Sequence, residues 1–384
     1  MLFKSARQSA APLTDAEKLA WIRLSRTENV GPITFYRFIE QFGSASKALE
    51  AIPTLTAKSK KQLVIPPLAA IEKEYERVRK NGGDMIAAAD DFYPLALAAT
   101  EDAPPVLSVL GNVELLNKAT IGIVGARNSS INGLKFAEKL AKELGEAGQM
   151  IASGLARGID TAAHNGSLET GTIAVVAGGI DIIYPRENEK LYAEIREKGA
   201  ILAENPLGVS PRSRDFPRRN RIVSGISQGI VVVEATVRSG SLITARLAGE
   251  QGRDVYAVPG HPLDPRASGP NALIRDGATL VRDAADILES INSFSGNQLS
   301  DVARPTYSVP LAANDEIIEA VHRPDATEAK TLLMNAMSFT PCEINELIRS
   351  ADIPASLAQT ILLELELCGE IQRLPGNRVM LVHA

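Results

Sequence analysis

The sequence predicts an α/β protein built around a doubly wound, mostly parallel sheet, with a helical domain before it and a small helix-and-hairpin domain after it. Short apolar runs of strand length alternate with helical patterns from residue 119 onward. Such alternation is typical of a parallel sheet that is buried on both faces. Residues 13 to about 80 show helical periodicity without strands, and three helices with a hairpin pattern end the chain. These observations divide the chain into domains at 1–82, 83–293 and 326–384, with a linker at 294–325.

The N-terminal domain, residues 1–82, has the pattern of several short helices. Thr14 and Asp15 can cap a first helix, and the tight turn Asn29-Val30-Gly31-Pro32 separates it from a second. Two short helices joined by a glycine-containing turn are typical of a helix-hairpin-helix or sterile-alpha-motif-like module. Such turns can hold a phosphate, but the sequence favours a small bundle whose aromatic residues form its core.

The central domain opens with an extended lead-in, residues 84–118, whose proline and glycine pairs predict one or two strands. The alternating part then predicts strands at 121–124, 150–153, 172–177, 200–204, 229–234 and 254–258, with an edge strand at 278–281. Helices are predicted between them at 131–145, 161–170, 188–198 and 241–252. This is an extended Rossmann-like sheet, and ligands bind such sheets at the carboxyl ends of the strands.

The C-terminal domain, residues 326–384, has the layout of a winged helix. Three helical patterns precede a β-hairpin, at residues 332–337, 341–350, 354–368, and 371–374 with 379–382. The domain carries seven acidic residues against four basic ones. Because a DNA-docking face needs net positive charge, we expect this domain to bind protein or to regulate the sheet domain.

The composition is that of a globular protein, with 45% hydrophobic and 23% charged residues. No apolar run reaches the roughly 18 residues of a membrane span, and the N-terminus has no apolar core of a signal peptide. Cys342, Cys368 and the four histidines show no metal-ligand spacing. We therefore expect a cytoplasmic protein with reduced cysteines, no metal site and no membrane partner.

The formal net charge of −5 argues against a globally basic nucleic-acid binder. A local basic cluster nevertheless stands between residues 210 and 221, opposed only by Asp215. Its members are Arg212, Arg214, Arg218, Arg219 and Arg221.

The stretch from residue 120 to 130 has the pattern of an anion-binding corner. A buried strand runs into Gly125, Ala126 and Arg127, and Ser129 and Ser130 can cap the helix that follows. Backbone N–H groups and the helix dipole favour an anion there, and Arg127 adds a forked cationic donor. The stretch lacks the G-x-G-x-x-G spacing and the Lys-Ser/Thr pair of nucleotide loops. A nucleotide cofactor is therefore disfavoured, and the alternative is close helix–strand packing at the glycine.

A second loop, residues 153–160, places Arg157 between Gly154 and Gly158, where two glycines allow a close approach of backbone to ligand. Asp160 can cap the helix predicted from residue 161, and His164 is best explained as a packing or hydrogen-bonding residue.

The basic cluster contains the run Phe216-Pro217-Arg218-Arg219-Asn220-Arg221, which combines a ring with guanidinium groups. Single-stranded nucleic acid needs this pairing, because phosphates attract the cations and unstacked bases lie on aromatic faces. We expect the run to form a loop at the ligand edge of the sheet, with Asn220 reading a base edge or bracing the loop.

A second anion corner is predicted at Ser239, Gly240 and Ser241, which open the helix after the strand ending at Glu234. Glu234 itself can be a nucleophile or base, but the sequence offers it no catalytic partner. Its favoured role is a hydrogen-bond acceptor for loop amides or an arginine.

Assembled in order, these motifs resemble the DNA-processing protein A family (DprA, also called Smf). The resemblance covers essentially the whole chain. It rests on Gly122 to Arg127, Ser153 to Asp160, Ala177-Gly178-Gly179, Tyr184-Pro185, Phe216 to Ile222, Glu234, Ser239 to Ala245 and Val258-Pro259-Gly260. Position 126 departs from the family, since it is Ala where Ser is frequent.

The resemblance implies a non-enzymatic protein without a cofactor that binds single-stranded DNA, protects incoming strands in natural transformation and helps to load the RecA recombinase. It also implies a homodimer formed through the sheet domain. Our hypothesis assigns phosphates to four arginines and to the second corner, and a stacked base to Phe216. The DNA-binding set is Gly125, Arg127, Ser129, Gly154, Arg157, Gly158, Phe216, Arg219, Asn220, Arg221, Ser239, Gly240 and Ser241.

Two alternatives stay open. One is a nucleotide-processing enzyme like the lysine-decarboxylase-like phosphoribohydrolases, in which Glu234 would act in base release, although the Pro-Gly-Gly loop of that family is missing here. The other is a protein-interaction scaffold that binds no oligonucleotide.

Overall fold

The computed structural model describes residues 13–56, 63–296, 326–368, 370–374 and 377–382. The chain forms two compact units. The first comprises Met1–Gly122, Gly148–Leu155 and Leu168–Gln228, and the second comprises Ile123–Ala147, Ala156–Ser167 and Gly229–Ala384.

The main sheet confirms the predicted fold class. Its nine strands follow the order β1-β2-β6-β5-β4-β3-β7-β8-β9. Strands β6, β5 and β4 pair in parallel, as do β7, β8 and β9, whereas β1 and β2 are antiparallel additions. The crossovers between parallel neighbours require helices, which explains the alternating pattern of the sequence.

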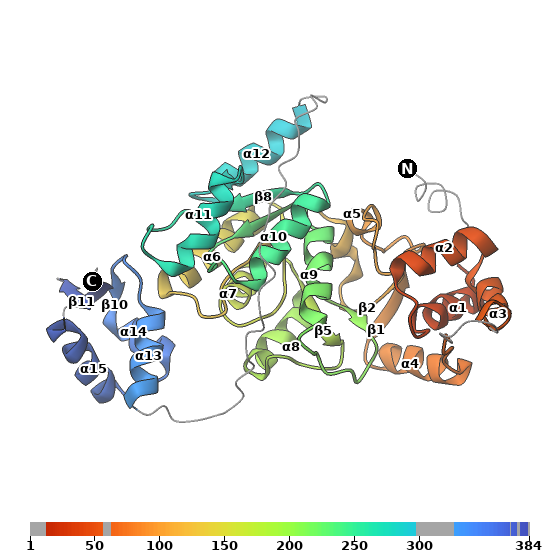
Figure 1. Cartoon of the computed structure of the whole chain (residues 1–384), viewed down its shortest axis with the longest axis horizontal. Helices are drawn as coiled ribbons and strands as arrows, with labels where there is room; N and C mark the ends of the chain where they lie inside the picture. The colour runs from red at the N-terminus through yellow and green to blue at the C-terminus, as the bar shows by residue number, and fades with distance from the viewer. Residues whose placement is uncertain (1–12, 57–62, 297–325, 369, 375–376, 383–384) are drawn as a thin grey trace. The chain divides into compact units, whose positions relative to one another are not determined.

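In residues 13–56 and 63–82, the described part of the N-terminal module, the chain forms four helices, drawn in red to orange in Figure 1: α1 (Asp15–Ser25), α2 (Pro32–Phe42), α3 (Ala45–Thr56) and α4 (Leu68–Lys80). Thr14 caps α1 as predicted, since its Oγ1 accepts a hydrogen bond from the Glu17 N–H at 3.3 Å. Trp21 and Phe35 are buried and meet edge to face at 4.9 Å between ring centres. The aromatic residues therefore form a core, as the sequence favoured.

The rest of the first unit contains five complete strands. They are β1 (Gly83–Ala87), β2 (Val106–Gly111), β4 (Met150–Ser153), β5 (Thr172–Gly179) and β6 (Ala200–Asn205). Its further helices are α5 (Leu95–Ala98), η2 (Val113–Asn117), η3 (Arg186–Asn188), α8 (Glu189–Lys198) and α9 (Asp215–Ile226). Strands β4 and β5 are buried along their whole length, which is why they read as continuous apolar runs.

The expected loop at Phe216–Arg221 is wrong, because these residues form the first turns of α9. Asp215 opens the helix and accepts a hydrogen bond from the Arg212 N–H at 2.8 Å through Oδ2. Pro217 fits the first turn, where its missing N–H removes no helical hydrogen bond. Ile222 and Ile226, one turn apart, are buried and anchor the helix on the sheet.

The second unit carries the end of β3 (Thr120–Val124), followed by α6 (Ile131–Glu146) and α7 (Ile159–Ser167). It continues with β7 (Gly229–Val232), α10 (Gly240–Glu250), β8 (Asp254–Ala257), η4 (Pro265–Ala267), α11 (Ser268–Arg275), β9 (Thr279–Leu280) and α12 (Ala284–Gly296). Ser130 caps α6 as predicted, since its Oγ accepts from the Gly133 N–H at 3.0 Å. Helices α6 and α7 pack closely, with Gly166 against the backbone of Glu138.

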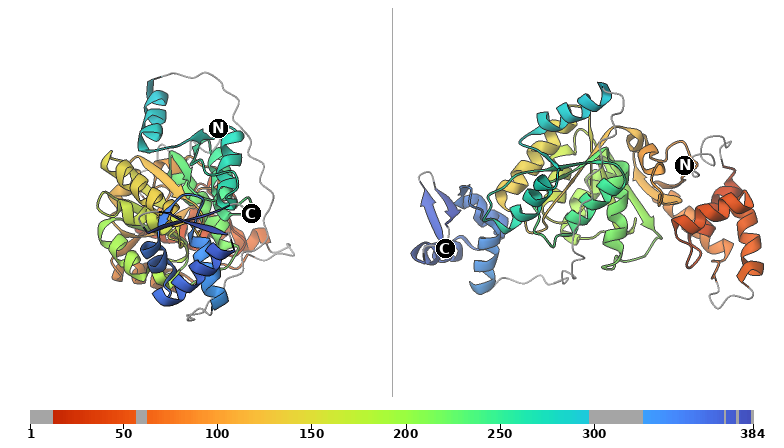
Figure 2. Two further views of the ribbon diagram at one scale, coloured as in Figure 1. Left: turned by 90° about the vertical axis from the view of Figure 1, so that its left-hand side faces the viewer. Right: turned by 45° about the horizontal axis from the view of Figure 1, so that its top comes forward.

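The C-terminal module, drawn in blue in Figure 2, has the predicted winged-helix layout. It contains α13 (Ala326–Ala336), β10 (Cys342–Glu343), α14 (Ile344–Ala351), α15 (Ala355–Leu367), β11 (Ile371–Leu374) and β12 (Arg378–Leu381). The helix predicted at 341–350 begins later than expected, because Cys342 and Glu343 pair with β12. Lys330 pairs with Glu370 at 3.5 Å and Arg373 with Glu366 at 3.1 Å.

Within the described ranges, no helix combines the length and the hydropathy that crossing a membrane requires. The predicted linker, residues 294–325, lies outside the described residues apart from its first three positions.

Candidate nucleic-acid interface

The predicted DNA-binding residues fall into both compact units. Gly154 and the α9 residues Phe216, Arg219, Asn220 and Arg221 belong to the first unit. The second unit carries Gly125, Arg127, Ser129, Arg157, Gly158, Ser239, Gly240 and Ser241. Each group is described on its own below.

The start of α6 in the second unit is occupied by a carboxylate of the protein itself. Glu234 accepts hydrogen bonds from the Ser130 N–H at 2.8 Å and from the Ser130 hydroxyl at 2.6 Å, one on each carboxylate oxygen. Gly133 makes room for it, because a Cβ there would lie within 2.7 Å of the carboxylate. The helix dipole favours an anion at this place, and Glu234 supplies it.

This geometry confirms the role that the sequence favoured for Glu234, a hydrogen-bond acceptor for a loop amide. Burial raises the pKa of the carboxyl, and the Ser130 hydrogen bonds together with the Arg266 charge oppose that rise. Since both oxygens are engaged with Ser130, the carboxylate is not aimed at a substrate, which disfavours the nucleophile of the alternative enzyme.

The glycines of the two predicted loops approach protein atoms. A Cβ at Gly125 would lie 2.6 Å from the Ile159 side chain, and one at Gly158 would lie 2.3 Å from the Ala126 carbonyl oxygen. Gly158 also has a φ of +78°, a conformation that side chains disfavour. The Gly158 segment therefore packs directly on the backbone that carries Arg127.

Arg127 and Arg157 are exposed, one on each of these packed loops. Two guanidinium groups thus reach solvent from loops whose backbones touch. Ser129 lies beside Arg127, and its Oγ is buried without a hydrogen-bond partner among the described residues. Asp160 is not the predicted cap, because α7 begins at Ile159 and Asp160 lies inside its first turn, accepting from the Ala156 N–H at 3.3 Å.

Helix α10 begins at Gly240, so the helix start predicted at Ser239–Ser241 is present. Ser239 caps the helix, and its Oγ lies 2.7 Å from the Ser241 Oγ. Gly240 is exposed, and a Cβ there would meet nothing within 4 Å. Of the four glycines assigned to DNA, Gly240 alone faces open space, whereas Gly125, Gly154 and Gly158 face protein atoms.

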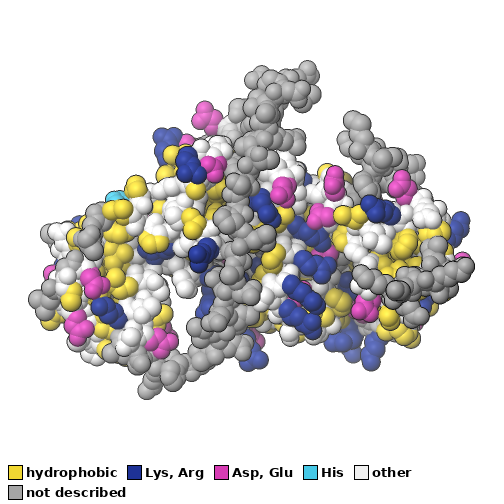
Figure 3. Space-filling view, viewed as in Figure 1, with side chains coloured by type: hydrophobic (Ala, Val, Ile, Leu, Met, Phe, Trp, Pro, Cys, Tyr) yellow, Lys and Arg dark blue, Asp and Glu magenta, His cyan; other side chains and the backbone are white. Residues whose placement is uncertain are grey.

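The basic cluster of the first unit is divided by α9 into an exposed and a buried part. Arg212, Arg214 and Arg218 are exposed, and Lys and Arg side chains gather over α9 in the space-filling view (Figure 3). Arg219 and Arg221 are only 6% and 7% exposed. Burial therefore separates five arginines that look alike in the sequence.

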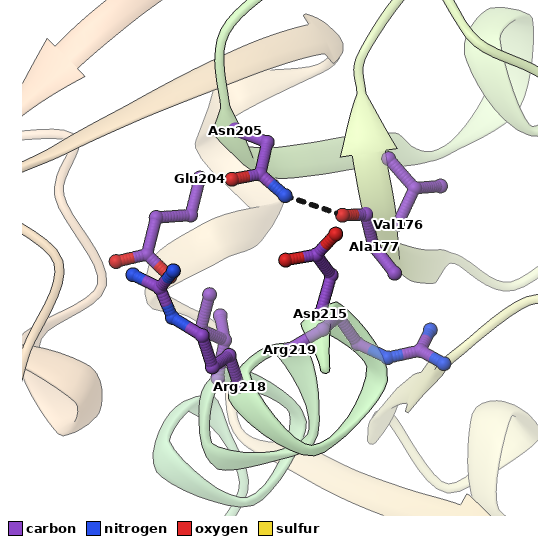
Figure 4. Close-up of a pocket in the computed structure, with 8 residues that line it drawn as sticks. Val176, Ala177, Glu204, Asn205, Asp215, Arg218 and Arg219 are labelled. Carbon is purple, nitrogen blue, oxygen red and sulfur yellow. Dashed lines mark hydrogen bonds between the residues drawn. The ribbon is translucent and has the colours of Figure 1, made fainter. Parts of the chain in front are cut away.

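Arg219 points from α9 to the end of β4 and to the middle of β5. Its Nη1 donates to the carbonyl oxygens of Gly154, just after β4, and Val175, in β5. Its Nε donates to the Asn220 Oδ1 at 3.2 Å. Figure 4 shows Arg218 and Arg219 leaving the helix in opposite directions. A Cβ at Gly154 would lie within 2.6 Å of three guanidinium atoms, so this glycine admits the arginine rather than a ligand.

Arg221 is held in an internal network. Its Nη2 lies 2.5 Å from the Glu204 Oε1, its Nε lies 3.6 Å from the Asp102 Oδ2, and Nη1 donates to the Asp102 carbonyl. Arg26, at the end of α1, donates to the Glu204 carbonyl at 2.9 Å. These contacts tie α9 to β6 and to the N-terminal module, so they give Arg221 a structural function.

Phe216 is half-buried and stands next to Tyr184, with 5.7 Å between ring centres and 58° between the ring planes. The tilted pair gives the first turn of α9 an apolar, aromatic surface beside the exposed arginines.

A small polar recess lies between α9 and the ends of β5 and β6 (Figure 4). It is lined by Val176, Ala177, Glu204, Asn205, Asp215, Arg218, Arg219 and Ile222. Asn205 donates to the Ala177 carbonyl at 2.6 Å. In the parts of the chain that the structure describes, no group of three His, Cys, Asp or Glu residues is placed to hold a metal ion.

The sequence of the central region matches a known family. Residues 84–292, more than half of the chain, match the model of DNA recombination-mediator protein A. The chain belongs to this family. Residues 15–76 match the DprA-like N-terminal HHH domain and residues 319–377 match the DprA winged helix domain.

Members of the DNA recombination-mediator protein A family from other bacteria are similar over most of their length. Protein Smf of Escherichia coli (strain K12) is 36% identical over 345 residues, which cover 86% of each chain. The X-ray structure of DNA processing protein A from Streptococcus pneumoniae is 33% identical, with a TM-score of 0.62, and the match covers 72% of this chain and 98% of that one. A Helicobacter pylori DNA processing protein A, whose structure describes a single-stranded DNA binding mode, is 28% identical with a TM-score of 0.51, covering 55% and 96%.

The exposed arginines of the basic cluster are absent from the DNA-binding set that the sequence predicts. Arg212, Arg214 and Arg218 were recognised as a basic cluster but not assigned to DNA, whereas their buried neighbours were. The signal was the helical spacing of Ile222 and Ile226 with Arg219 and Asp215, all of which lie on the buried side of α9.

Proposed function

We propose that this protein is a non-enzymatic, single-stranded DNA-binding recombination mediator. The observation that carries the proposal is the start of α9, where Arg212, Arg214 and Arg218 are exposed beside the Phe216–Tyr184 ring pair. Exposed cations and an aromatic surface are the two elements by which proteins bind unstacked strands.

The position of these arginines near the N-terminus of α9 supports the binding of an anionic ligand. Cations near a helix N-terminus oppose the dipole and cost about 0.3–1 kcal/mol each. Only Asp215 offsets them in the first turn of α9. Bound phosphates remove this unfavourable charge, which gives the arrangement a functional reason. Arg127 and Arg157 supply a further pair of exposed cations in the second unit.

The family assignment supports the finer parts of the proposal. A relative is described as binding single-stranded DNA, and others are named DNA processing protein DprA. From the family description as a recombination mediator, we propose that this chain acts in natural transformation, helps to load RecA on DNA, and works in the cytoplasm as a homodimer through its sheet domain. RecA-filament formation on strands coated with single-strand binding protein, with and without this protein, tests the loading role.

A titration of labelled single-stranded and double-stranded oligonucleotides at two salt concentrations tests DNA binding. We expect tighter binding of the single strand and an affinity that falls steeply with salt, since cations release counterions from the phosphates. Arg127→Ala is expected to lower the slope of log affinity against log salt by about 0.7, the value for one phosphate of a single strand. Equal affinity for both oligonucleotides, or no binding of either, would contradict the proposal.

A further inference from the structure

We infer that Arg219 is a positioning residue for DNA binding, whose guanidinium lies over Gly154, fastens α9 to β5 and to the end of β4, and does not contact the DNA. The inference rests on the proposed function. It assigns to Arg219 contacts within the protein in place of the phosphate contact that the sequence predicts. Arg219 acts through the residues of α9 that do face solvent.

The contacts of Arg219 fix two parts of the first unit to each other. One nitrogen reaches the carbonyl groups of Gly154 and Val175, and Nε reaches Asn220 on its own helix. A planar guanidinium offers five donors in a fixed fork, so one side chain can serve several acceptors on neighbouring segments. Lys has a single ammonium on a flexible stem and does not reproduce this geometry.

Gly154 is the second half of the arrangement. The guanidinium occupies the space that a Cβ at this position would take. Gly154 is itself buried, as is Arg219. The pair therefore requires a glycine at the end of β4 and an arginine in the first turns of α9.

The helix that Arg219 fastens carries Arg218 and the Phe216 ring, and the segment that leads into it carries Arg212 and Arg214. Arg218 is the adjacent residue, and it points away from Arg219 (Figure 4). Phe216 lies two residues before Arg218, in the first turn of α9. If α9 shifts on the sheet, Arg212, Arg214 and Phe216 shift with it, so the loss of Arg219 weakens binding without removing a phosphate contact.

The salt dependence of binding distinguishes this role from a direct contact. A residue that neutralises a phosphate of a single strand contributes about 0.7 to the slope of log affinity against log salt. A positioning residue changes the affinity and leaves this slope alone. Arg218→Ala is the matched control, because it removes the exposed arginine next in the chain.

The experiment measures single-stranded DNA affinity at three or more salt concentrations for the full chain and for Arg219→Ala, Arg219→Lys, Arg218→Ala, Gly154→Ala and the Gly154→Ala/Arg219→Ala double variant. We expect Arg219→Ala to weaken binding about tenfold, which is about 1.4 kcal/mol, with an unchanged slope. Arg218→Ala should lower the slope by about 0.7. Arg219→Lys should fold and still bind weakly, which covers the case in which Arg219→Ala is unstable.

The double variant tests the contact itself. Once the guanidinium is absent, the added methyl group of Gly154→Ala fits in its place, so the double variant should bind no worse than Arg219→Ala alone. Additive losses would show that the two residues act independently.

Three results would overturn the inference: a slope that falls in Arg219→Ala as it does in Arg218→Ala, an unchanged affinity in Arg219→Ala, or additivity in the double variant. Failure of the unmodified protein to bind any single strand would instead contradict the proposed function, and this role of Arg219 with it.

Discussion

In each compact unit a charged side chain lies over a glycine, and the two arrangements differ in what the charge touches. In the first unit, Arg219 covers Gly154 and donates to carbonyl groups at the sheet. In the second unit, Glu234 covers Gly133 and accepts from Ser130 at the start of α6. The Arg219 cation thus donates hydrogen bonds to carbonyl groups, whereas the Glu234 anion accepts hydrogen bonds from an amide and a hydroxyl.

The comparison teaches that charged residues inside a binding motif can serve the backbone of that motif. Both buried charges have exposed cations close by in sequence or structure: Arg218 beside Arg219, and Arg127 on the segment that leads to Ser130. Arg219 and Glu234 hold the backbone of their segments in place, whereas Arg218 and Arg127 are exposed and available to a ligand.

The largest expected effect comes from filling the two glycine positions. Gly154→Ala should lower the free energy of unfolding by about 2–4 kcal/mol, because the displaced guanidinium stays charged and leaves buried carbonyls unpaired. Gly133→Ala should cost less, about 1–2 kcal/mol, since the displaced carboxyl can take up a proton. Urea denaturation followed by circular dichroism measures both.

Gly240→Ala is the control for these substitutions, because nothing lies within 4 Å of its Cβ position. It should change stability by no more than about 0.5 kcal/mol. A loss at Gly240 as large as at Gly154 would break the comparison.

The exposed side of the basic cluster should govern binding. Replacing Arg212, Arg214 and Arg218 together by Ala should weaken single-stranded DNA binding about 30-fold at low salt and lower the salt slope by about 2. Lys190→Ala removes an exposed cation of α8 that is paired with Glu194 at 3.7 Å, and it should change neither quantity appreciably. Fluorescence anisotropy at several salt concentrations measures the slopes, and a slope unaffected by the triple substitution would reject the assignment.

The Phe216–Tyr184 ring pair should contribute to the affinity for single-stranded DNA without affecting its salt dependence. Phe216→Leu keeps apolar volume but removes the aromatic face, and stacking on such a face is worth about 1–3 kcal/mol per base. We expect about a tenfold loss of single-strand affinity at an unchanged slope, with a smaller loss in Tyr184→Leu. Binding to an abasic oligonucleotide should not distinguish Phe216→Leu from the unmodified protein, and if it does, the ring has another function.

The smallest effect concerns the titration of Glu234. Because burial raises its pKa above the ordinary 4.5, the folded protein binds this proton more tightly than the unfolded chain does. The contribution of Glu234 to stability is therefore full below the unfolded pKa and is lost as the pH rises through the folded pKa. Relative to Glu234→Gln, the unmodified protein should lose stability as the pH is raised from about 4.5 toward neutrality. A difference that is independent of pH would contradict the burial of this charge.

The fold was largely predictable from the sequence, because parallel strands buried on both faces leave continuous apolar runs such as Ile173 to Val176. Both helix caps at Thr14 and Ser130 were also predictable, since capping depends on a few neighbouring residues. Local sequence patterns therefore predicted the helices and strands and their order along the chain.

The site was only partly predictable, because burial of a charged residue depends on distant segments. Arg219 lies 65 residues from the Gly154 carbonyl that it contacts, and Ser130 lies 104 residues from Glu234. Composition suggested a solvated basic loop at Phe216–Arg221, whereas the apolar spacing of Ile222 and Ile226 extends the helix back to Asp215. The helical periodicity of α9 determines which arginines are buried and which are exposed.

The carboxylate at the start of α6 also bears on which molecules compete with DNA. A free nucleotide usually gains its phosphate affinity from vacant amide and hydroxyl donors at such a helix start. Here Glu234 already holds the N–H and the hydroxyl of Ser130, and a second anion beside it meets charge repulsion. The nucleotide pool of a cell would thus be a poor competitor at this corner, and a long strand that gathers many separate contacts would keep its advantage.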